Sequence, residues 1–439
     1  MTQTAEALAR TSLLINQELF GGEAEELLVS AALPEGCIEL KGSRESLSTR
    51  AGQTALVTAF ILVARMGVGI RLDIPDVAVI DQVPPLCASR LGEALADLGR
   101  DLIPGVPIPP ASGPVDATFS FGDTGDSDAI QVTAGDLEAC LDRFVQMGES
   151  EGRLPFGGLA AGAAVAAVTF EAMVPRIESR VGLCARMPRP SPGPPVRIDL
   201  GQLFPSLGEQ IPGSLGAIEA VSGGAITNAL IFCLLRVPEL EVGIRVIEDD
   251  VADLTNLNRY MLLRRSQVGL HKVAHLRSAT AKRVKVDGIE LLFNGETRDR
   301  ILPLADRVLV GVDDVQARWW VQEAEPRWLA VGATGNHLAQ LSVHIPGGPC
   351  AGCVHNVPLP PQTIPTISFV SFWAGLLQAC ALLSDLREPA NVSVYPFALG
   401  GPMSFTSLAP QHSPTCPVGC SASDRRPICD TNGTPLETA

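Results

Sequence analysis

The stretch VIEDDVADLTNLNRYMLLRRSQVGLHK, residues 246–272, decides how this chain is organised. An apolar strand closes there on Glu248 and Asp250. A turn then carries Asn256 and Arg259, and Lys272 comes after a short helical stretch. These side chains would set carboxylates, an amide and two cations around one crevice. Hydroxyls of a ribose and the charge of a triphosphate suit such a set, so the crevice is predicted to bind ATP.

A loop of small residues, SGGAIT at 222–227, precedes this stretch and lies between a strand and a helix. Gly223 and Gly224 let the backbone approach a phosphate, and the N-terminus of the following helix favours an anion. The loop departs from G-x-G-x-x-G at Ser222 and Thr227. By itself it is therefore explained equally well as a close strand–helix turn without a ligand.

Two acids at strand ends add to the pattern. Glu248 follows Gly224 by 24 residues, near the spacing at which a dinucleotide-binding βαβ unit places its ribose carboxylate. Asp313 ends the strand 308–312 at the carboxyl edge of the sheet, where open α/β sheets bind ligands. Its carboxylate would suit Mg²⁺. Each acid alone could be a solvated charge, but the ordered series indicates a site.

Residues 217–386 resemble the ThiF/MoeB adenylating enzymes and the activating enzymes of ubiquitin-like modifiers. The resemblance rests on EDD at 248–250, TNLNR at 255–259, GLHK at 269–272 and DDVQAR at 313–318. Glu248 stands where Asp is usual, and Asp314 where Asn is usual. The resemblance implies a ribose contact from the first acid, phosphate contacts from the amide and cations of the turn, and Mg²⁺ at Asp313. The residues implied in the site are Gly223, Gly224, Glu248, Asp250, Asn256, Arg259, Lys272 and Asp313.

The resemblance extends to the N-terminus. Family members open with a helix whose Arg reaches into the ATP site of a partner subunit, and Arg10, followed by Phe20-Gly21, stands at that place. Arg10 would then act on the triphosphate as an arginine finger does. The alternative without a function is that Arg10 is a solvent-exposed residue of the helix.

Strands and helices alternate along the chain, which implies βαβ units and largely parallel sheets. The order occurs twice, because strand 37–40 corresponds to 217–221, strand 117–121 to 308–312, and helix 157–175 to 369–386. Helices are also expected over 134–147 and from the motif turn to about 285, and a further strand over 77–80. The first copy lacks a Gly loop, and no Asn/Arg/Lys series follows Asp81.

The predicted fold is therefore α/β, with two tandem Rossmann-like, ThiF-type domains that form a pseudo-dimer, and a zinc-binding C-terminal extension. The expected division is a degenerate domain over 1–183, a Pro-rich linker over 184–200, an active adenylation domain over 201–412 and a zinc-ligand tail over 413–439. Since family members are dimers, a homodimer of the whole chain also stays open.

Two close cysteine pairs predict a structural zinc site with four thiolate ligands, Cys350, Cys353, Cys416 and Cys420. Cys429 could replace Cys420, and His355 and His412 are further candidate ligands. The alternative to a metal site is that these cysteines are free thiols on loops. Such a closed site would fix the tail to the domain and take no part in the reaction.

The thiol that would receive an activated modifier is missing from its usual place, because the loop 357–367 holds no cysteine. Cys233 and Cys380 lie in apolar helices and are predicted to be core residues. Cys184 and Cys429 are the accessible candidates. Hydroxyls in or beside the loop keep an oxyester open: Thr363, Thr366 and Ser368.

Composition sets limits on partners and location. The 439 residues are 46% hydrophobic and 18% charged, as in a globular protein, and the net charge of −15 disfavours sequence-independent binding of nucleic acid. The N-terminus lacks the pattern of a secretory signal, and the 14-residue apolar run 157–170 is too short to span a bilayer. No membrane contact and a cytoplasmic location are therefore expected.

These features together predict an ATP- and Mg²⁺-dependent enzyme that adenylates the C-terminal carboxylate of a ubiquitin-like modifier, and a conjugating enzyme is a candidate partner. A bacterial conjugation or antiviral defence pathway would suit the fused architecture. Three alternatives stay open: a sulfur-carrier adenylyltransferase of cofactor biosynthesis, a non-catalytic modifier-binding scaffold, and an NAD-linked oxidoreductase.

Overall fold

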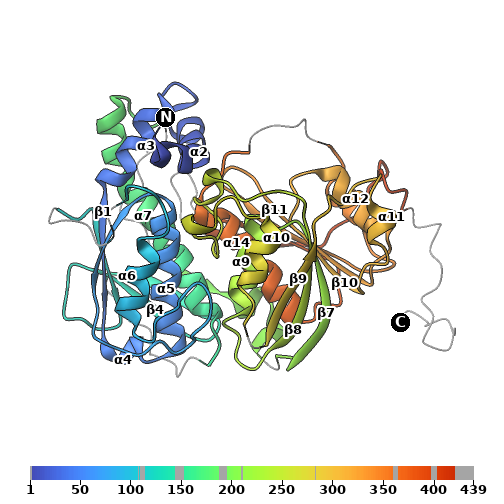
Figure 1. Ribbon diagram of the computed structural model, residues 1–439, viewed down its shortest axis with the longest axis horizontal. Helices are drawn as coiled ribbons and strands as arrows, with labels where there is room; N and C mark the ends of the chain where they lie inside the picture. The colour runs from blue at the N-terminus through green and yellow to red at the C-terminus, as the bar shows by residue number, and fades with distance from the viewer. Residues whose placement is uncertain are drawn as a thin grey trace.

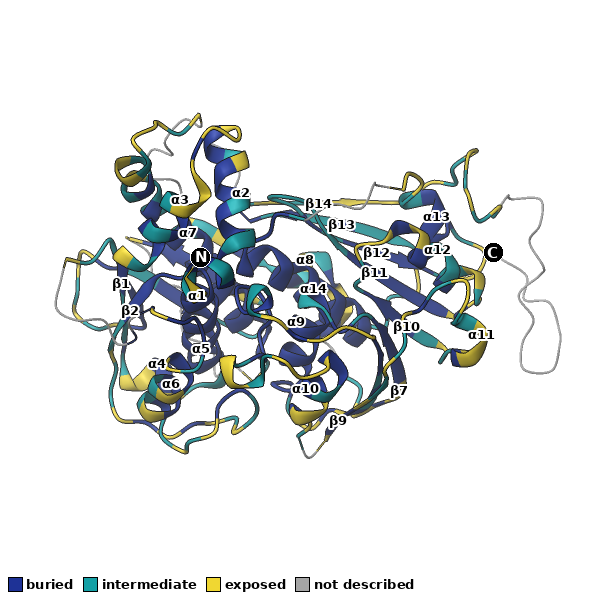
Figure 2. Ribbon diagram, turned by 45° about the horizontal axis from the view of Figure 1, so that its top comes forward, coloured by how far each residue is buried: buried dark blue, intermediate teal, exposed yellow. Residues whose placement is uncertain are grey.

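The computed structural model describes residues 2–106, 108, 114–143, 153–186, 195–208, 211–281, 283–358, 364–396 and 403–420. They form an α/β fold with two mixed β-sheets, one in each half of the chain, and with helices packed between the sheets (Figure 1). Buried residues concentrate in the sheets and in these helices, and exposed residues lie mainly in peripheral loops and short helices (Figure 2).

The first sheet has the strand order β2-β1-β3-β4-β5-β6. Its strands from β2 to β4 run parallel, and β5 is antiparallel to both of its neighbours. The strands are β1 (Cys37–Gly42), β2 (Gly69–Asp73), β3 (Ala117–Phe121), β4 (Ile130–Ala134), β5 (Glu138–Asp142) and β6 (Val196–Asp199).

The second sheet has the order β14-β13-β12-β11-β10-β7-β8-β9. It is parallel from β9 to β11 and antiparallel from there to β14. The strands are β7 (Ser214–Val221), β8 (Glu241–Ile247), β9 (Val284–Ile289), β10 (Arg307–Val310), β11 (Trp328–Thr334), β12 (Ala339–His344), β13 (Ala390–Tyr395) and β14 (Ser404–Leu408).

The two sheets share one strand order. The series β2-β1-β3-β4-β5-β6 matches β8-β7-β10-β11-β12-β13 in sequence order and in strand direction, and the second sheet adds β9 and β14 at its edges. Helix α5 (Arg50–Arg65) follows β1 as α9 (Ala225–Leu234) follows β7, and α7 (Phe156–Val181) precedes β6 as α14 (Ser368–Leu383) precedes β13. The three correspondences predicted from the sequence agree with this order.

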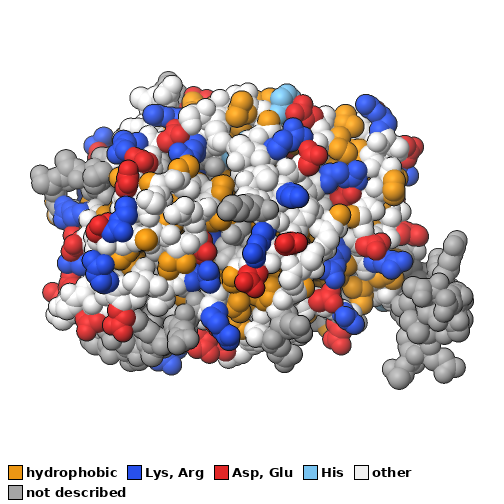
Figure 3. Space-filling model, turned by 60° about the horizontal axis from the view of Figure 1, so that its bottom comes forward, with side chains coloured by type: hydrophobic (Ala, Val, Ile, Leu, Met, Phe, Trp, Pro, Cys, Tyr) orange, Lys and Arg blue, Asp and Glu red, His pale blue; other side chains and the backbone are white. Residues whose placement is uncertain are grey.

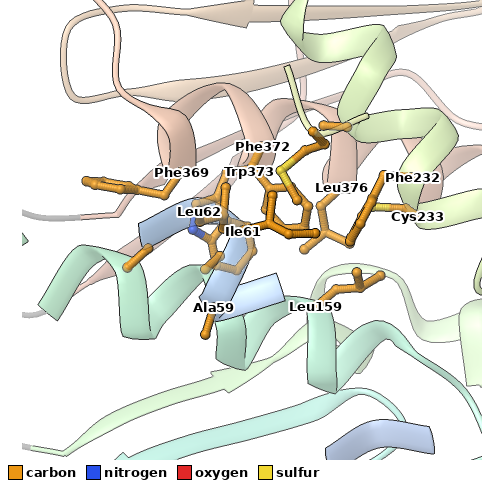
Figure 4. Close-up of a cluster of buried hydrophobic side chains, with 14 of the residues drawn as sticks. Ala59, Ile61, Leu62, Leu159, Phe232, Cys233, Phe369, Phe372, Trp373 and Leu376 are labelled. Atoms are coloured by element: carbon orange, nitrogen blue, oxygen red, sulfur yellow. The ribbon is translucent and has the colours of Figure 1, made fainter. Parts of the chain in front are cut away.

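The four helices α5, α7, α9 and α14 meet in one apolar core between the sheets. Their side chains are apolar almost all round, which is typical of helices buried on every side. Figure 4 shows α5 residues Ile61 and Leu62 beside α14 residues Phe372 and Trp373, with Phe232 from α9. The two halves therefore share a hydrophobic core.

Glycines permit close helix crossings in both halves. A Cβ on Gly162 of α7 would lie 2.5 Å from Thr58 Cβ on α5, and a Cβ on Gly375 of α14 would lie 2.5 Å from Ala229 Cβ on α9. Such distances exclude any larger residue without movement of the partner helix. Each half thus packs its two long helices in the same way.

The remaining α-helices complete the fold. They are α1 (Gln3–Ala7), α2 (Ala9–Phe20), α3 (Glu26–Ala32), α4 (Arg44–Leu47), α6 (Leu91–Gly99), α8 (Leu200–Leu203), α10 (Lys272–Ser278), α11 (Arg298–Ile301), α12 (Val315–Glu323) and α13 (Ala351–Val354).

Helix α7 is longer than its apolar run suggested. It spans 26 residues and, among the described residues, is the one helix with the length and composition to cross a membrane. Of its most apolar window, 78% is buried inside the protein, as in a core helix. The 14-residue run alone underestimated the helix, because polar residues after Phe170 continue it to Val181.

Three predicted elements were wrong. The expected helix 134–147 is replaced by the end of β4 and by β5, whose hairpin pairing overrides the apolar pattern, and residues 144–147 lie outside the described part. The helix expected to continue to about 285 ends at Ser278, because β9 joins the sheet edge from Val284. In place of a strand over 77–80 there is only an isolated bridge between Ala78 and Arg90.

Candidate functional site

A pocket of about 400 Å³ lies at the carboxyl edge of the parallel strands in the second sheet. The loops after β7, β8, β9 and β10 line it, and α2 and residues 364–366 close one side. All but one of the predicted nucleotide residues line it: Arg10, Gly224, Glu248, Asp250, Asn256, Arg259, Lys272 and Asp313. Gly223 lies directly behind, bonded to Glu248.

The Gly loop is built around the buried carboxylate of Glu248, which is 8% exposed. Gly223 N–H donates to Glu248 Oε2 over 2.8 Å, and Asp250 N–H donates to Oε1 over 3.2 Å. A Cβ on Gly223 would lie 3.1 Å from Glu248 Cγ and 3.3 Å from Lys272 Cβ. Ser222 has a φ of 96°, in the left-handed region, where glycine is the residue that fits without strain.

Lys272 lies at the start of α10 and faces the same carboxylates. Its Nζ is 2.6 Å from Asp250 Oδ2 and 3.8 Å from Glu248 Oε2. Burial by itself would lower the pKa of Lys272, but Tyr260, Glu248 and Asp250 outweigh it and hold this pKa above its usual range. The ammonium is therefore charged and fixed at the pocket wall.

Side chains of the turn after β8 make hydrogen bonds within the turn itself. Asn256 Oδ1 accepts from Asp253 N–H over 3.0 Å, in a capping box that opens the 3₁₀ turn Leu254–Asn256. Arg259 is buried, and its Nη1 donates to Thr255 O and, over 2.7 Å, to Asn258 Oδ1. Burial lowers the pKa of Arg259. The charge of Arg10 lowers this pKa further, whereas Tyr260 and Asp313 raise it.

Arg10 enters this pocket from the other half of the chain. Its Nη1 donates to Ile364 O over 3.2 Å, and Thr366 N–H donates to Arg10 O over 3.3 Å. Asn258 Nδ2 donates to Thr11 Oγ1 over 2.8 Å, so α2 is also bonded to the turn after β8. These contacts place the Arg10 guanidinium in the same cavity as Arg259.

Asp313 is exposed on the turn between β10 and α12. Asp314 caps α12 by accepting from Gln316 N–H over 2.9 Å. Arg318 donates twice to Val312 O, over 3.1 Å from Nε and 2.8 Å from Nη2. The residues on either side of Asp313 are therefore bonded, and its carboxylate stands at the pocket edge.

Two polar residues that support the Gly loop were not predicted from the sequence. Asn228 Nδ2 donates to Gly223 O over 3.1 Å and to Gly224 O over 2.9 Å, and His275 Nε2 lies 3.1 Å from Asn228 Oδ1. His275 follows Lys272 by three residues and so shares its helix face, a spacing that could have identified it. Tyr260, a buried pocket residue beside Arg259, was missed as well.

The four predicted zinc ligands come together. Cys350 Sγ lies 3.3 Å from Cys416 Sγ, and Cys353 Sγ lies 3.2 Å from Cys420 Sγ. Four thiolates at about 2.3 Å from a tetrahedral Zn²⁺ are about 3.8 Å apart, close to these distances. A Cβ on Gly352 would lie 3.1 Å from Cys416 Sγ, so the loop is shaped around the sulfurs. The cluster could hold a metal ion.

The other candidate zinc ligands are His355, His412 and Cys429, and their positions relative to the cluster differ. His355 uses its ring nitrogens on Arg318 and Ser342, at 3.1 and 3.0 Å, and so turns away from the sulfurs. His412 Nδ1 is 3.8 Å from Cys420 Sγ, next to the cluster. Cys429 lies outside the described residues.

The candidate nucleophiles are spread over the chain. Cys233 and Cys380 are fully buried in α9 and α14, as predicted. Cys184 is exposed but follows α7 at the far end of α2, since Arg186 N–H donates to Leu19 O. That end is about 14 Å along α2 from Arg10.

Of the hydroxyl candidates, Thr366 lines the pocket. Ser368 Oγ donates to Leu62 O in the core, over 2.8 Å. Thr363 lies outside the described residues.

Comparison with known proteins finds a family match within the second half of the chain. The model of the ThiF family matches residues 241–416, so the family predicted from the sequence is confirmed for this region. An uncharacterized protein of Sinorhizobium fredii, y4jF, is 29% identical over 148 residues, which are 33% of this chain and 28% of that protein. The adenylyltransferase and sulfurtransferase MOCS3 of Anopheles gambiae is 28% identical over 196 residues, 40% of this chain and 44% of that protein.

The chain thus spans less than half the length of these curated relatives. Among solved structures, E. coli MccB in complex with MccA-N7isoASN is 19% identical, with a TM-score of 0.39, over 46% of this chain and 66% of MccB. The structure of MccB with ATP is 20% identical, with a TM-score of 0.38 over the same shares.

Proposed function

We propose, from the ThiF family domain that this chain carries over residues 241–416, that the protein uses ATP to adenylate the C-terminal carboxylate of a small protein. A ubiquitin-like modifier is the substrate we favour, and a sulfur carrier is the alternative. One observation carries the proposal: Arg10 from one half and Arg259 and Lys272 from the other converge on one pocket with a buried acid at its back.

In this proposal the nucleotide lies along the carboxyl edge of the sheet. Glu248 accepts from the ribose hydroxyls, because its carboxylate is fixed by two backbone N–H groups and faces the pocket. The Gly loop and the N-terminus of α9 face the phosphates. The volume of about 400 Å³ is within the range of small-molecule sites.

Charge balance supports a divalent cation. The pocket wall carries the cations Arg10, Arg259 and Lys272 and a larger set of carboxylates, Glu248, Asp250, Asp253, Asp313 and Asp314. A triphosphate beside that many acids would be repelled unless a bound cation screened it. Asp313, exposed at the pocket edge, is the carboxylate we assign to Mg²⁺, which prefers oxygen and phosphate ligands.

The proposed reaction needs alignment more than side-chain acid or base chemistry. A carboxylate oxygen of the substrate attacks the α-phosphorus of ATP and forms the new P–O bond of an acyl-adenylate. The bond from that phosphorus to the bridging oxygen of the β-phosphate breaks, and pyrophosphate leaves with the electron pair. Arg10, Arg259 and Lys272 stabilise the charge that develops on the phosphate oxygens.

The two halves are proposed to form a pseudo-dimer with one active site. Reciprocal contacts support this arrangement. Arg65, at the end of α5, donates to carbonyls of the second half, and Arg236, just past the end of α9, borders a small cavity beside Ile80 and Asp81 of the first half. The same element of each half thus reaches across to the other.

The first half fills its own crevice. Gln53 Nε2 donates to Ala78 O over 2.9 Å, Gln53 Oε1 accepts from Ile80 N–H over 2.7 Å, and Arg50 pairs with Asp81 at 3.0 Å. The cavity between these residues measures about 10 Å³, too small for a nucleotide. In this proposal the first half supplies Arg10 and structural support.

The cysteine cluster is proposed to bind a structural zinc ion. Cys350 directly precedes α13, Cys353 lies within it, and Cys416 and Cys420 lie on the last described loop, so the metal would join the tail to the domain. Bound Zn²⁺ would supply folding free energy here.

The identity of the partner is also a proposal. MOCS3 is by name an adenylyltransferase and sulfurtransferase, which would suit a sulfur-carrier substrate. The fused halves favour a modifier that is passed on to a conjugating enzyme. On the face seen in Figure 3, cationic and anionic side chains are intermingled, which suits a protein partner better than a nucleic acid.

Pyrophosphate release tests the proposal, with the full-length protein, ATP, Mg²⁺ and a small protein that ends in Gly-Gly. Arg259→Ala and Asp313→Ala should each abolish the release. Arg265→Ala, an exposed residue of the same segment outside the pocket, is the matched control and should retain it.

Full activity in both pocket variants would refute the site assignment. Calorimetry separates the alternatives, because a scaffold would bind the small protein without ATP. An oxidoreductase would instead bind NADH, with a change in its fluorescence.

A further inference from the structure

A buried chain of hydrogen bonds runs from the turn that carries Asp313 toward the cysteine cluster. Arg318, which is 7% exposed, donates from Nη1 to His355 Nδ1 over 3.1 Å, while its other two nitrogens, Nε and Nη2, donate to Val312 O. His355 Nε2 lies 3.0 Å from Ser342 Oγ. Ser342 Oγ lies 2.9 Å from His344 Nε2.

The chain then reaches the cluster itself. His344 Nδ1 lies 2.9 Å from the carbonyl oxygen of Pro349, and the next residue is Cys350. Ser342 and His344 are 0% and 1% exposed, so water cannot replace their bonds. The bonds thus form a continuous route between the two sites.

The direction of every bond follows from the chemistry of its ends. Arginine only donates, so His355 Nδ1 accepts and its Nε2–H donates to Ser342 Oγ. A carbonyl only accepts, so His344 Nδ1–H donates to Pro349 O. Burial lowers the pKa of His344, so its ring is neutral and its Nε2 accepts from the Ser342 hydroxyl. Ser342 is thus the hydroxyl that joins two opposed histidines.

Further bonds hold the two ends of this route in one rigid unit. Trp319 Nε1 donates to His355 O over 2.6 Å, and Ala351 N–H donates to Gln322 Oε1 over 2.9 Å. Helix α12, which begins at the Asp313 turn, is therefore bonded to α13, which begins beside the first cluster ligand. A displacement of α13 would be carried to the turn.

We propose that this chain of hydrogen bonds couples the cysteine cluster to the magnesium site. An intact cluster would then hold the Val312 carbonyl and the Asp313 carboxylate in place for the Mg²⁺–ATP complex. His355 and Ser342 are positioning residues in this scheme, because they act through Arg318. The inference rests on the proposed function and deepens it. It gives the cluster a role in the binding of the nucleotide's metal, beyond fixing the tail.

The Mg²⁺-dependent part of ATP affinity is the quantity that tests this coupling. Calorimetry on the whole chain gives the Kd of ATP with Mg²⁺ and in Mg²⁺-free buffer, without a chelator that would remove zinc from the cluster. The ratio of the two Kd values is the magnesium gain. Ser342→Ala should lower the gain by up to about tenfold, the low end of the range for residues bonded directly to a metal ligand, because Ser342 acts through His355 and Arg318. The Kd in Mg²⁺-free buffer should stay unchanged, which a general loss of structure would not allow.

Paired variants identify the route. Ser342→Thr keeps the hydroxyl and should restore most of the gain, and Ser407→Ala on the exposed strand β14 is the control. Cys416→Ser, which removes a cluster ligand, should lower the gain as Ser342→Ala does. The double variant should be no worse than either single one, because both break the same connection. Zinc content, measured on each protein, reports the state of the cluster independently of ATP.

The outcomes separate this inference from the function on which it rests. Asp313→Ala should abolish the magnesium gain, and if it does not, the assigned metal ligand is wrong and the coupling falls with it. If Asp313→Ala abolishes the gain while Ser342→Ala keeps it, the coupling alone is refuted. Additive losses in the double variant would refute it too. Should Ser342→Ala fail to fold, His355→Asn replaces it, since its Oδ1 can accept from Arg318 but its shorter side chain cannot donate to Ser342.

Discussion

Arg65 Nη1 donates to the carbonyl oxygen of Leu257 over 2.6 Å, although 192 residues separate them in the chain. The same fully buried guanidinium also donates to the carbonyls of Met261 and Leu263. It thereby fixes the segment that carries Arg259 and Tyr260 from the opposite half. Burial lowers the pKa of Arg65 to about 9.

Arg65→Lys should lower the free energy of unfolding by about 2–4 kcal/mol. A lysine has no planar fork for three carbonyls, and buried acceptors left without donors are costly. Urea denaturation measures the loss. Arg387→Lys, at an exposed position, should be neutral, and equal stability of the two variants would contradict the role of Arg65.

Gly223→Ala should weaken ATP binding about tenfold at a stability cost of roughly 1 kcal/mol, because the new Cβ presses on Glu248 and Lys272 and displaces the loop. Calorimetry gives the ATP affinity, and thermal unfolding gives the stability. Gly213→Ala, where a Cβ would meet nothing within 4 Å, is the matched control. An unchanged affinity would show that the loop does not contact the nucleotide.

Arg10→Ala should lower kcat for adenylation by about 10²-fold, the usual cost of removing one donor that stabilises transition-state charge. Thermal stability should change little, since the side chain is only partly buried. Pyrophosphate release under saturating ATP measures the effect. Gln17→Ala, exposed on the same helix, should behave as the wild type. A normal kcat would make Arg10 a residue of the interface only.

Removal of zinc should destabilise the protein and release a single ion per chain. Metal binding contributes folding free energy where four thiolates close a tetrahedral site. Metal analysis with thermal unfolding, before and after a strong chelator, checks this. Cys350→Ser should abolish zinc binding, and Cys184→Ser, at an exposed thiol away from the cluster, should retain it. Zinc retained by both variants would place the ion elsewhere.

Stability should fall on acidification through two buried histidines. Burial lowers the pKa of His275 to about 3 and the pKa of His344 to about 4, against about 6.5 in the unfolded chain. Between these values the unfolded state binds more protons, so unfolding becomes easier as pH falls, by up to about 1.4 kcal/mol per pH unit for each histidine.

Urea denaturation at pH 7 and pH 5.5 measures this dependence. His275→Gln should reduce the difference between the two pH values, while the same change at half-exposed His271 serves as the control. Equal pH dependence in the wild type and His275→Gln would contradict the neutral, buried state of His275.

The predicted nucleotide residues of the second half line one pocket, and the sequence could bring them together because they lie within short, ordered motifs. Glu248 to Lys272 span one strand end, one turn and one helix start, and strand ends at the same sheet edge are neighbours in any parallel sheet. The close cysteine pairs could be matched for a similar reason. The failed elements, such as the helix expected over 134–147, are places where pairing with a distant strand overrode the local pattern.

The sequence by itself thus determined the family of residues 241–416, the alternation of strands and helices, and the identity of the charged groups around one crevice. Only the tertiary structure decided other contacts between distant residues, such as Arg65 with Leu257, and His355 with Arg318 and Ser342. The physical reason is range. Strand and turn propensities act over a few residues, whereas contacts between the halves depend on how two apolar helix pairs pack, and no local motif encodes that packing.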